Sequence, residues 1–152
     1  MKVSVVLDEG AKMPTKAHNS DAGFDLYSRE DKIIPPYILI AGTYGSSEEI
    51  YPSQTFDTGV HIEIPEGYVG FLKSKSGLNV KHHITSDGVI DAGYTGSIVV
   101  KLYNHGKDYY QVKKGDKIAQ LVILPIPEIE LVQVDKLEET ERGDNGFGSS
   151  GR

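Results

Sequence analysis

Cysteine is absent from the 152-residue chain, and its absence removes three kinds of chemistry. Disulfide bonds, thiolate zinc sites and a cysteine nucleophile are all excluded. A basic surplus is lacking too: the formal net charge is −6, whereas nucleic-acid binding needs clustered cations. No segment reaches the ~20 apolar residues of a membrane-spanning helix, and the first residues lack a signal-peptide pattern. We therefore expect no nucleic-acid partner, no membrane, and a cytoplasmic location, which is the host cytoplasm if the chain is viral.

Helical periodicity is also scarce, because no window of ten or more residues has a clean 3.6-residue repeat. Apolar residues instead alternate with other residues in three segments, residues 3–7, 60–64 and 98–102. Such alternation is typical of a strand with one buried face. Residues 118–126 are nearly all apolar and predict a central strand buried on both faces. Ser76 is a good N-cap residue and predicts one short helix that ends near His82. The prediction is an all-β, jelly-roll-like fold with at most one short helix.

The length fits one domain, which we assign to residues 1–137, followed by a flexible C-terminal arm over residues 138–152. The arm is charged and then glycine-rich, so it cannot fold by itself. Its Gly-x-Gly-x-x-Gly pattern at 146–151 does not predict a dinucleotide fold, because only one residue follows it. Its amides, hydroxyls and arginine nevertheless suit phosphate oxygens. Residues 42–53 are polar and predict a surface loop.

Three further features each allow two interpretations. Residues 73–78 place two lysines and serines at the start of the predicted helix, which indicates either an anion site or a solvated basic turn. Asp91, within residues 88–96, is either an ordinary turn residue or a carboxylate general base with Tyr94 beside it. Phe147 either packs on a neighbouring surface or stacks on a flat ligand. The five histidines lack metal-ligand spacing, so zinc is not expected.

Five segments, in order, resemble the five motifs of the homotrimeric dUTPase family. They are residues 21–28 (DAGFDLYS), 75–78 (KSGL), 88–96 (GVIDAGYTG), 115–121 (GDKIAQL) and 142–151 (RGDNGFGSSG). The resemblance implies a jelly-roll-like (β-clip) dUTPase fold and a homotrimer with shared active sites. It also implies hydrolysis of dUTP to dUMP and pyrophosphate with Mg²⁺, which limits uracil in DNA and supplies dUMP for thymidylate synthesis.

The same resemblance implies roles for individual residues. Asp91 would activate the water that attacks the α-phosphorus, and Asp25 would hold a water on Mg²⁺. The substrate-binding residues would be Lys75, Ser76 and Gly77 at the triphosphate, Gly88, Val89 and Ile90 at the edge of uracil, Tyr94 under the deoxyribose, Gln120 at phosphate through its backbone, and Arg142, Phe147, Gly148, Ser149 and Ser150 in a lid. Val99 would also bind the substrate. Residues 88–90 would belong to a narrow hairpin. The chain departs from the family at Lys75, where arginine is usual, and at Thr85 and Asp87, where Asn and Pro are frequent.

Two rival functions remain. The dCTP deaminases share the fold, but their glutamate base would fall at Lys101, and a lysine cannot take that role. A regulatory protein that uses the nucleotide site as a switch is the second rival, because some phage members of the family act on repressors. If the chain is phage-encoded, a regulatory protein partner is expected, with residues 42–53 as a contact surface.

Overall fold

The computed structural model of the chain describes residues 1–36, 38–39, 49–50 and 52–144. Thirteen strands and one helix lie within these residues. In chain order they are β1 (Val5–Leu7), β2 (Gly23–Tyr27), β3 (Lys32–Ile34), β4 (Ile38–Leu39), β5 (Glu49–Ile50), β6 (Ser53–Asp57), β7 (Val60–Ile62), β8 (Tyr68–Ser74), α1 (Ser76–His82), β9 (Ile84–Thr85), β10 (Asp87–Ile90), β11 (Val99–Asn104), β12 (Tyr110–Val112) and β13 (Lys117–Pro125).

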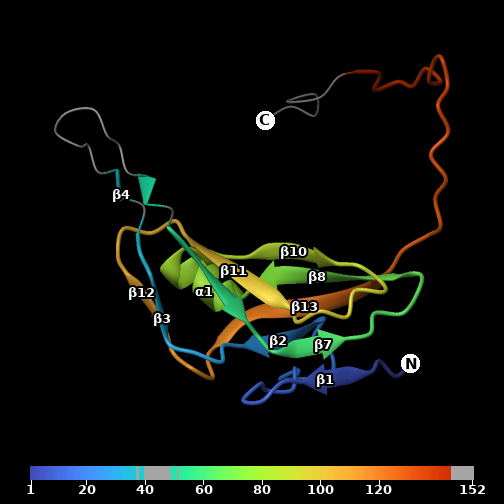
Figure 1. Cartoon of the computed structure of the whole chain (residues 1–152). Coiled ribbons are helices and arrows are strands. Elements are labelled where there is room, and N and C mark those ends of the chain that lie inside the picture. Colours follow the sequence, from blue (N-terminus) through green and yellow to red (C-terminus); the bar gives the residue numbers. More distant parts are fainter. Residues whose placement is uncertain (37, 40–48, 51, 145–152) are drawn as a thin grey trace.

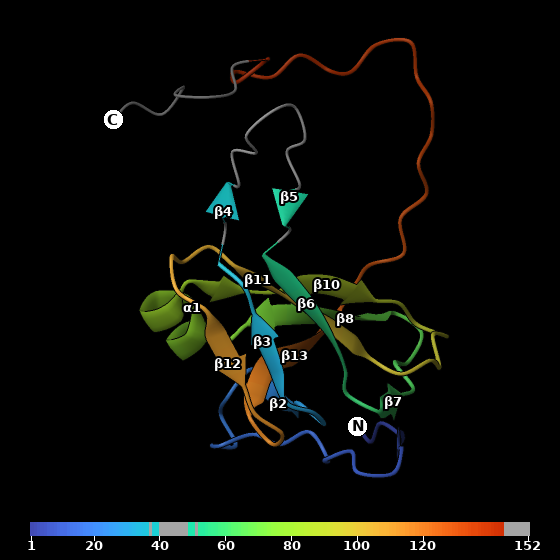
Figure 2. The ribbon, with the colours of Figure 1, turned by 60° about the vertical axis from the view of Figure 1, so that its left-hand side comes forward.

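Two sheets make up most of the molecule. One has four strands in the order β10-β8-β13-β2, and the other has three in the order β6-β11-β9. Figures 1 and 2 show β6 and β11 crossing over β8 and β13, with α1 at one end of the sheets. Three two-stranded pairs, β1-β7, β12-β3 and β4-β5, complete the antiparallel arrangement. The prediction of an all-β, jelly-roll-like fold with one short helix is confirmed over the described residues.

The core lies between the two larger sheets and follows the alternation seen in the sequence. Ile98, Val100 and Leu102 are 0%, 0% and 1% exposed, whereas Lys101 between them faces solvent. Phe56 on β6 and Leu121 on β13 join the same buried cluster. Burial of these apolar side chains is the main favourable contribution to folding.

Two local predictions need correction. Ser76 is the first residue of α1 and not its N-cap; Lys75 occupies the cap position in an extended conformation, without a side-chain capping bond. The strand over residues 118–126 is central, but it is buried on both faces only at its start. Ala119 is fully buried, whereas Leu124 is 46% exposed. The reason is that β2 pairs with β13 only as far as Val122, so the end of β13 has lost one neighbour.

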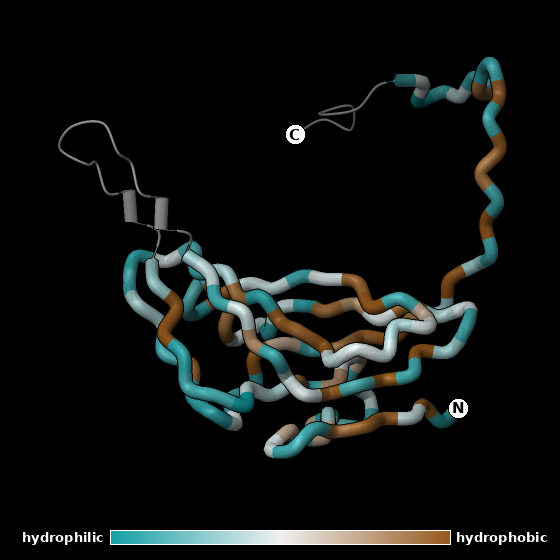
Figure 3. Tube along the Cα trace, in the orientation of Figure 1, coloured by the Kyte–Doolittle hydropathy of each residue, from teal (hydrophilic) through white to brown (hydrophobic). Residues whose placement is uncertain are grey.

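Residues 126–144 form no strand or helix and lead away from the sheets. Their apolar side chains stay exposed, including Leu131 at 93% and Leu137 at 80%. Figure 3 shows these apolar positions alternating with polar ones along the segment. Among the described residues no helix is long and apolar enough to cross a membrane.

Candidate functional site

One group of predicted site residues meets where β2, β13 and β8 lie side by side. Gln120 of β13 is paired with Asp25 on β2 and with Lys73 on β8. The end of β8 then leads directly into Lys75 and α1. The sheet register therefore brings Asp25, Lys75 and Gln120 together, although they belong to three separate motifs. We call this group, with Lys117, the Asp25 cluster.

Asp25 is the buried centre of this cluster, with only 4% of its surface exposed. Its Oδ2 lies 2.6 Å from Nζ of Lys117, and its Oδ1 accepts a hydrogen bond from Nζ of Lys75. Burial by itself would raise the pKa of Asp25. The hydrogen bonds and charges of Lys117 and Lys75 outweigh burial, so the pKa lies below its ordinary value. Asp25 is thus a fixed anion.

Lys117 was not predicted as a site residue, although it lies within the fourth motif. Its pKa is raised, chiefly by the hydrogen bond to Asp25. The Nε2 of Gln120 donates to the carbonyl of Ser74 at 3.0 Å, which fixes its side chain beside the start of α1. Gly23 makes room for it, since a Cβ there would lie 2.6 Å from Oε1 of Gln120. Ser76 and Gly77 are exposed at the first turn of α1.

Asp91 and Tyr94 lie in the connection between β10 and β11, residues 91–98, which we call the Tyr94 loop. The amide of Tyr94 donates to the carbonyl of Asp91 at 3.2 Å, and Gly93 adopts a φ of +83°, which favours glycine. Asp91 is exposed, and over the described residues its carboxylate has no hydrogen-bond or ion-pair partner. It is therefore available to contact water. The phenol of Tyr94 donates to the carbonyl of Ser97 at 3.0 Å.

The expectation of a narrow hairpin at residues 88–96 is wrong as regards strand pairing. β10 pairs with β8, whereas β11 pairs with β6 and β9. The Tyr94 loop therefore crosses from one sheet to the other. Val89 and Val99, on the two strands that flank the loop, are 57% and 46% exposed.

The two groups lie at opposite ends of β8. Ile90, just before Asp91, is paired with Gly70, near the start of β8, whereas Lys75 follows its last residue. A strand rises about 3.3 Å per residue, so Gly70 and Ser74 are about 13 Å apart. The connection from Ile90 to Asp91 leads further from α1. Within one chain, the structure therefore does not bring Asp91 and Lys75 together.

The remaining predicted residues belong to the C-terminal arm. Arg142 is exposed and lies in the segment that leads away from the sheets. Phe147, Gly148, Ser149 and Ser150 lie outside the described residues, as do residues 42–48 and 51 of the predicted surface loop. The rest of that segment is partly strand and not all loop, because residues 49–50 form β5 and Ser53 begins β6. Across the described part of the chain, no three His, Cys, Asp or Glu side chains are grouped in a way that could hold a metal ion.

Sequence reasoning also missed the residues that hold the Tyr94 loop. Nδ1 of His61 lies 2.8 Å from the carbonyl oxygen of Thr95, and Oγ of Ser97 donates to Oδ1 of Asp57. His61 and Asp57 come from β7 and β6, far from the loop in sequence. No pattern in the chain pointed to these contacts.

Comparisons with known proteins give one consistent result. The dUTPase family model matches residues 9–151. The deoxyuridine 5'-triphosphate nucleotidohydrolase of Clostridium tetani (strain Massachusetts / E88) is 44% identical over 152 residues, covering 97% of this chain and 94% of that protein. The nucleotidohydrolase of the same name from Alkaliphilus metalliredigens is 42% identical over 144 residues, with coverages of 93% and 90%.

Solved structures give the same picture. The dUTPase of Staphylococcus bacteriophage 80alpha with dUPNHPP superposes with a TM-score of 0.84 at 34% identity, over 99% of both chains. A dUTPase mutant from phage phi11 of S. aureus, described for the coordination of a structural Mg(II) ion, has a TM-score of 0.76 at 33% identity, over 91% of this chain and 100% of that one.

Proposed function

The chain belongs to the dUTPase family, and from this premise we propose that it hydrolyses dUTP to dUMP and pyrophosphate through a water activated by Asp91. Membership confirms the resemblance of the five motifs and the expectation of a hydrolase of this family. The observation that carries the proposal is the contrast between two aspartates. Asp25 is held by two ammonium groups and is a poor proton acceptor, whereas the exposed carboxylate of Asp91 is unpaired within the described residues.

The chemistry requires positioning more than covalent participation, as in phosphoryl transfer generally. Asp91 would hold a water by hydrogen bond and accept its proton as the water oxygen attacks the α-phosphorus. Pyrophosphate leaves as the new phosphorus–oxygen bond forms. The backbone of Gly88, Val89 and Ile90, with Val99, would bind uracil. The ring of Tyr94 would pack on the deoxyribose and exclude a 2′-hydroxyl.

The Asp25 cluster would bind the triphosphate. Lys75 and Lys117 supply positive charge, Ser76 and Gly77 supply a hydroxyl and backbone amides, and Gln120 contacts a phosphate. The arm, residues 138–152, would close over the nucleotide through Arg142, Phe147, Gly148, Ser149 and Ser150. Lysine at position 75 lacks the planar fork of arginine and would contact phosphate as a point charge.

Mg²⁺ fits this arrangement when the nucleotide supplies its ligands. The described residues offer no cage of three acidic or imidazole groups, but magnesium prefers to keep waters and to bind through phosphate oxygens. Asp25 would then accept a hydrogen bond from a metal-bound water. When bound, the ion would neutralise charge on the triphosphate.

A shared site between subunits follows from the direction of the bound nucleotide. In the proposed contacts, uracil lies at residues 88–90, and the sugar and α-phosphate follow at Tyr94 and Asp91. The nucleotide therefore runs along β10 in the direction away from α1. The triphosphate therefore points away from Lys75 of the same chain. A second copy must supply the Asp25 cluster, and we propose the homotrimer of the family. A partner copy would also cover exposed apolar side chains such as Leu131, which is 93% exposed.

The direct test of function is incubation with each deoxynucleoside triphosphate and with UTP, in the presence of magnesium. We expect pyrophosphate release from dUTP alone, and dUMP as the nucleotide product. Equal release from dCTP or dTTP, or the appearance of a deaminated product, would refute the proposal.

A separate test addresses the shared site. Asp91→Asn and Lys75→Met are each expected to be inactive. The first removes the general base from every site, and the second removes a triphosphate-binding cation from every site. When the two variants are unfolded together and refolded, random assembly leaves about a quarter of the sites with both residues intact. Activity should then return to roughly that fraction. If the mixture stays as inactive as its components, the site is not shared between copies.

A second, additional function is regulatory. The 80alpha protein, which is similar over 99% of both chains, is described as controlling transfer of virulence genes. A related structure of that protein addresses its capacity to induce a SaPI. We propose that this chain has a comparable protein partner. The measurement is SaPI induction on expression of this chain, with the 80alpha protein as positive control; no induction under conditions where the control induces would exclude it.

A further inference from the structure

The Tyr94 loop has few internal contacts, and its position depends on side chains from elsewhere. Residues 91–95 are all exposed. Ile98, at the end of the loop, is held by hydrogen bonds to Val60 and Thr58. Before it, two side-chain bonds attach the loop to the body: His61 to the carbonyl of Thr95, and Ser97 to Asp57. Thr95 directly follows Tyr94. The bond from His61 to Thr95 therefore fixes the backbone next to Tyr94, and with it the position from which the side chain of Tyr94 extends.

His61 is itself held from the opposite side. Its Nε2 lies 3.1 Å from Oδ1 of Asp8, the residue that follows β1. Both partners of the imidazole, a carbonyl oxygen and a carboxylate, accept hydrogen bonds and cannot donate them. Both ring nitrogens must therefore carry hydrogen for the two bonds to exist together, and this is the imidazolium form. A neutral ring keeps one N–H and loses one of the two bonds.

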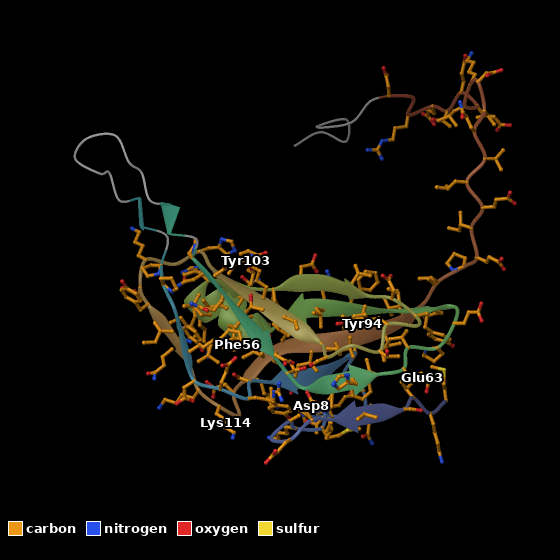
Figure 4. The ribbon with its side chains drawn as sticks, in the orientation of Figure 1. Asp8, Phe56, Glu63, Tyr94, Tyr103 and Lys114 are labelled. Atoms are coloured by element: carbon orange, nitrogen blue, oxygen red, sulfur yellow. The ribbon has the colours of Figure 1, made fainter. Side chains whose placement is uncertain are left out.

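A single arginine organises the carboxylates that support the loop. Nη2 of Arg29 lies 2.7 Å from Oδ2 of Asp57, and its Nη1 lies 3.6 Å from Oδ2 of Asp8. Gly59, with a φ of +64°, makes the approach possible, because a Cβ there would lie 2.8 Å from Nη1 of Arg29. Arg29 thus supports both side-chain attachment points of the loop, one through Asp8 and His61 and one through Asp57 and Ser97. Figure 4 shows Asp8 beside β1 and Tyr94 in the loop after β10.

We propose that His61 and Asp8 are positioning residues for the Tyr94 loop, with the imidazolium of His61 as a proton-dependent bridge from Asp8 to the carbonyl of Thr95. This proposal rests on the proposed function, in which the loop carries the general base and the sugar contact. Above the pKa of His61 one bond of the bridge is lost, and Tyr94 and Asp91 become less well placed. A misplaced Tyr94 discriminates less well against a 2′-hydroxyl.

The charged surroundings of His61 favour the protonated form. The hydrogen bond to Thr95 is the largest influence and raises its pKa, and desolvation opposes it. The hydrogen bond and charge of Asp8 and the charge of Asp57 add to the rise, so the pKa lies above its ordinary value. Glu63, just after β7, lines the same open cleft of about 500 Å³ as Asp8, His61 and Thr95. Arg29 forms ion pairs with Asp8 and Asp57, so its charge is directed to those carboxylates. The bridge is fully formed below the ordinary pKa of 6.5 and is lost as the pH rises through the raised value.

The test compares the whole protein with Asp8→Asn, His61→Ala and Glu63→Gln. Asparagine keeps an acceptor for Nε2 but removes the charge, so the pKa of His61, followed by NMR, should fall. Glu63→Gln is the matched control, because it removes a carboxylate from the same cleft that makes no hydrogen bond to His61. For dUTP, the fall of kcat/KM on the alkaline side should move to lower pH in Asp8→Asn and stay nearly unchanged in Glu63→Gln.

In His61→Ala, the fall of kcat/KM for dUTP that is due to His61 should disappear from the alkaline side of the pH profile. The preference for dUTP over UTP should narrow by about three- to tenfold, the usual effect of one hydrogen bond. Superimposable pH profiles for the parent protein and Asp8→Asn would overturn the proposal, as would equal shifts in Asp8→Asn and Glu63→Gln. A parent protein without dUTPase activity refutes the proposed function instead. The NMR titration, with the amide signals of Tyr94 and Thr95 as reporters of the loop, still decides whether the bridge exists.

Discussion

Nζ of Lys117 lies 2.6 Å from Oδ2 of Asp25, which gives this buried carboxylate a second ammonium partner besides Lys75. One carboxylate thus fixes two cations on neighbouring elements, the start of β13 and the residue before α1. Because a buried charge is costly without partners, the cluster holds together only while Asp25 is ionised. The arrangement prepares two positive charges for an anionic ligand before the ligand arrives.

The first prediction concerns the stability of the fold at acid pH. The folded pKa of Asp25 is lowered, so its contribution to stability is present above the ordinary value of 3.8 and is lost as the pH falls through the folded value. Lys117→Met removes one lowering partner, raises the folded pKa, and should move acid unfolding to higher pH. Circular dichroism between pH 2 and 6 measures the midpoint.

Lys107→Met is the control for general loss of positive charge, since Lys107 is an exposed lysine in the loop before β12. It should leave the acid midpoint near that of the parent protein. If both variants shift the midpoint equally, the effect is one of net charge and the ion pair with Asp25 is not responsible.

The second prediction concerns the general base. Asp91→Asn keeps the shape of the side chain but removes its ability to accept a proton. A general base typically contributes 10²–10⁴-fold in rate, so kcat for dUTP should fall by about that factor. Binding of a non-hydrolysable dUTP analogue, measured by calorimetry, should change little. Turnover close to that of the parent protein would mean that another group activates the water.

The outcome for the site shows what local pattern can and cannot reveal. Alternation predicted the strands around Ile62 and Val100, because a two-residue period depends only on which face is buried. The pairing of Asp25 with Lys117 was not predictable, because it depends on the register between β2 and β13, which shifts between Lys117 and Ala119. The apolar pattern of a strand constrains which face is buried, but it does not say which residue of a strand distant in sequence lies opposite.

The error at the expected hairpin has the same origin. A turn sequence such as residues 91–93 indicates that the chain reverses, but it does not say whether the flanking strands pair with each other. Here the two flanking strands pair with other strands: β10 pairs with β8, and β11 pairs with β6 and β9. The contact of His61 with Thr95 likewise joins residues that come together only after β7 and the Tyr94 loop are in place.

The third prediction concerns sugar choice. Tyr94→Ala removes the ring that would fill the space of a 2′-hydroxyl, so the preference for dUTP over UTP should narrow, mostly through weaker kcat/KM for dUTP. Tyr94→Phe is the matched control: it keeps the ring and loses only the hydrogen bond to Ser97. The phenylalanine variant should therefore keep most of the preference. An alanine variant that discriminates as well as the parent protein would show that the sugar is selected elsewhere.

The fourth prediction concerns the arm. β13, the last strand of the described residues, ends at Pro125. Among the described residues the buried core ends at Leu121, with Ile123 partly buried against it. A chain that ends after Glu141 should therefore unfold at the same temperature as the parent protein and should still assemble. Light scattering measures the assembly, and calorimetry the unfolding. A truncated chain that became monomeric would show that residues 142–152 are structural.

The same truncation should nevertheless remove most of the turnover. Residues 142–152 are rich in glycine and serine, and ordering such a segment costs roughly 1–2 kcal/mol of backbone entropy per residue. Contacts of Arg142 with phosphate and of Phe147 with uracil must offset this cost, so closure requires the nucleotide. A closed arm excludes water and fixes the triphosphate for attack, and its loss should lower kcat/KM by about 10²-fold, as misplaced substrates generally do. A chain that ends after Gly151 keeps every proposed lid residue and should remain fully active. Equal activity of the two truncated chains would show that the arm takes no part in the reaction.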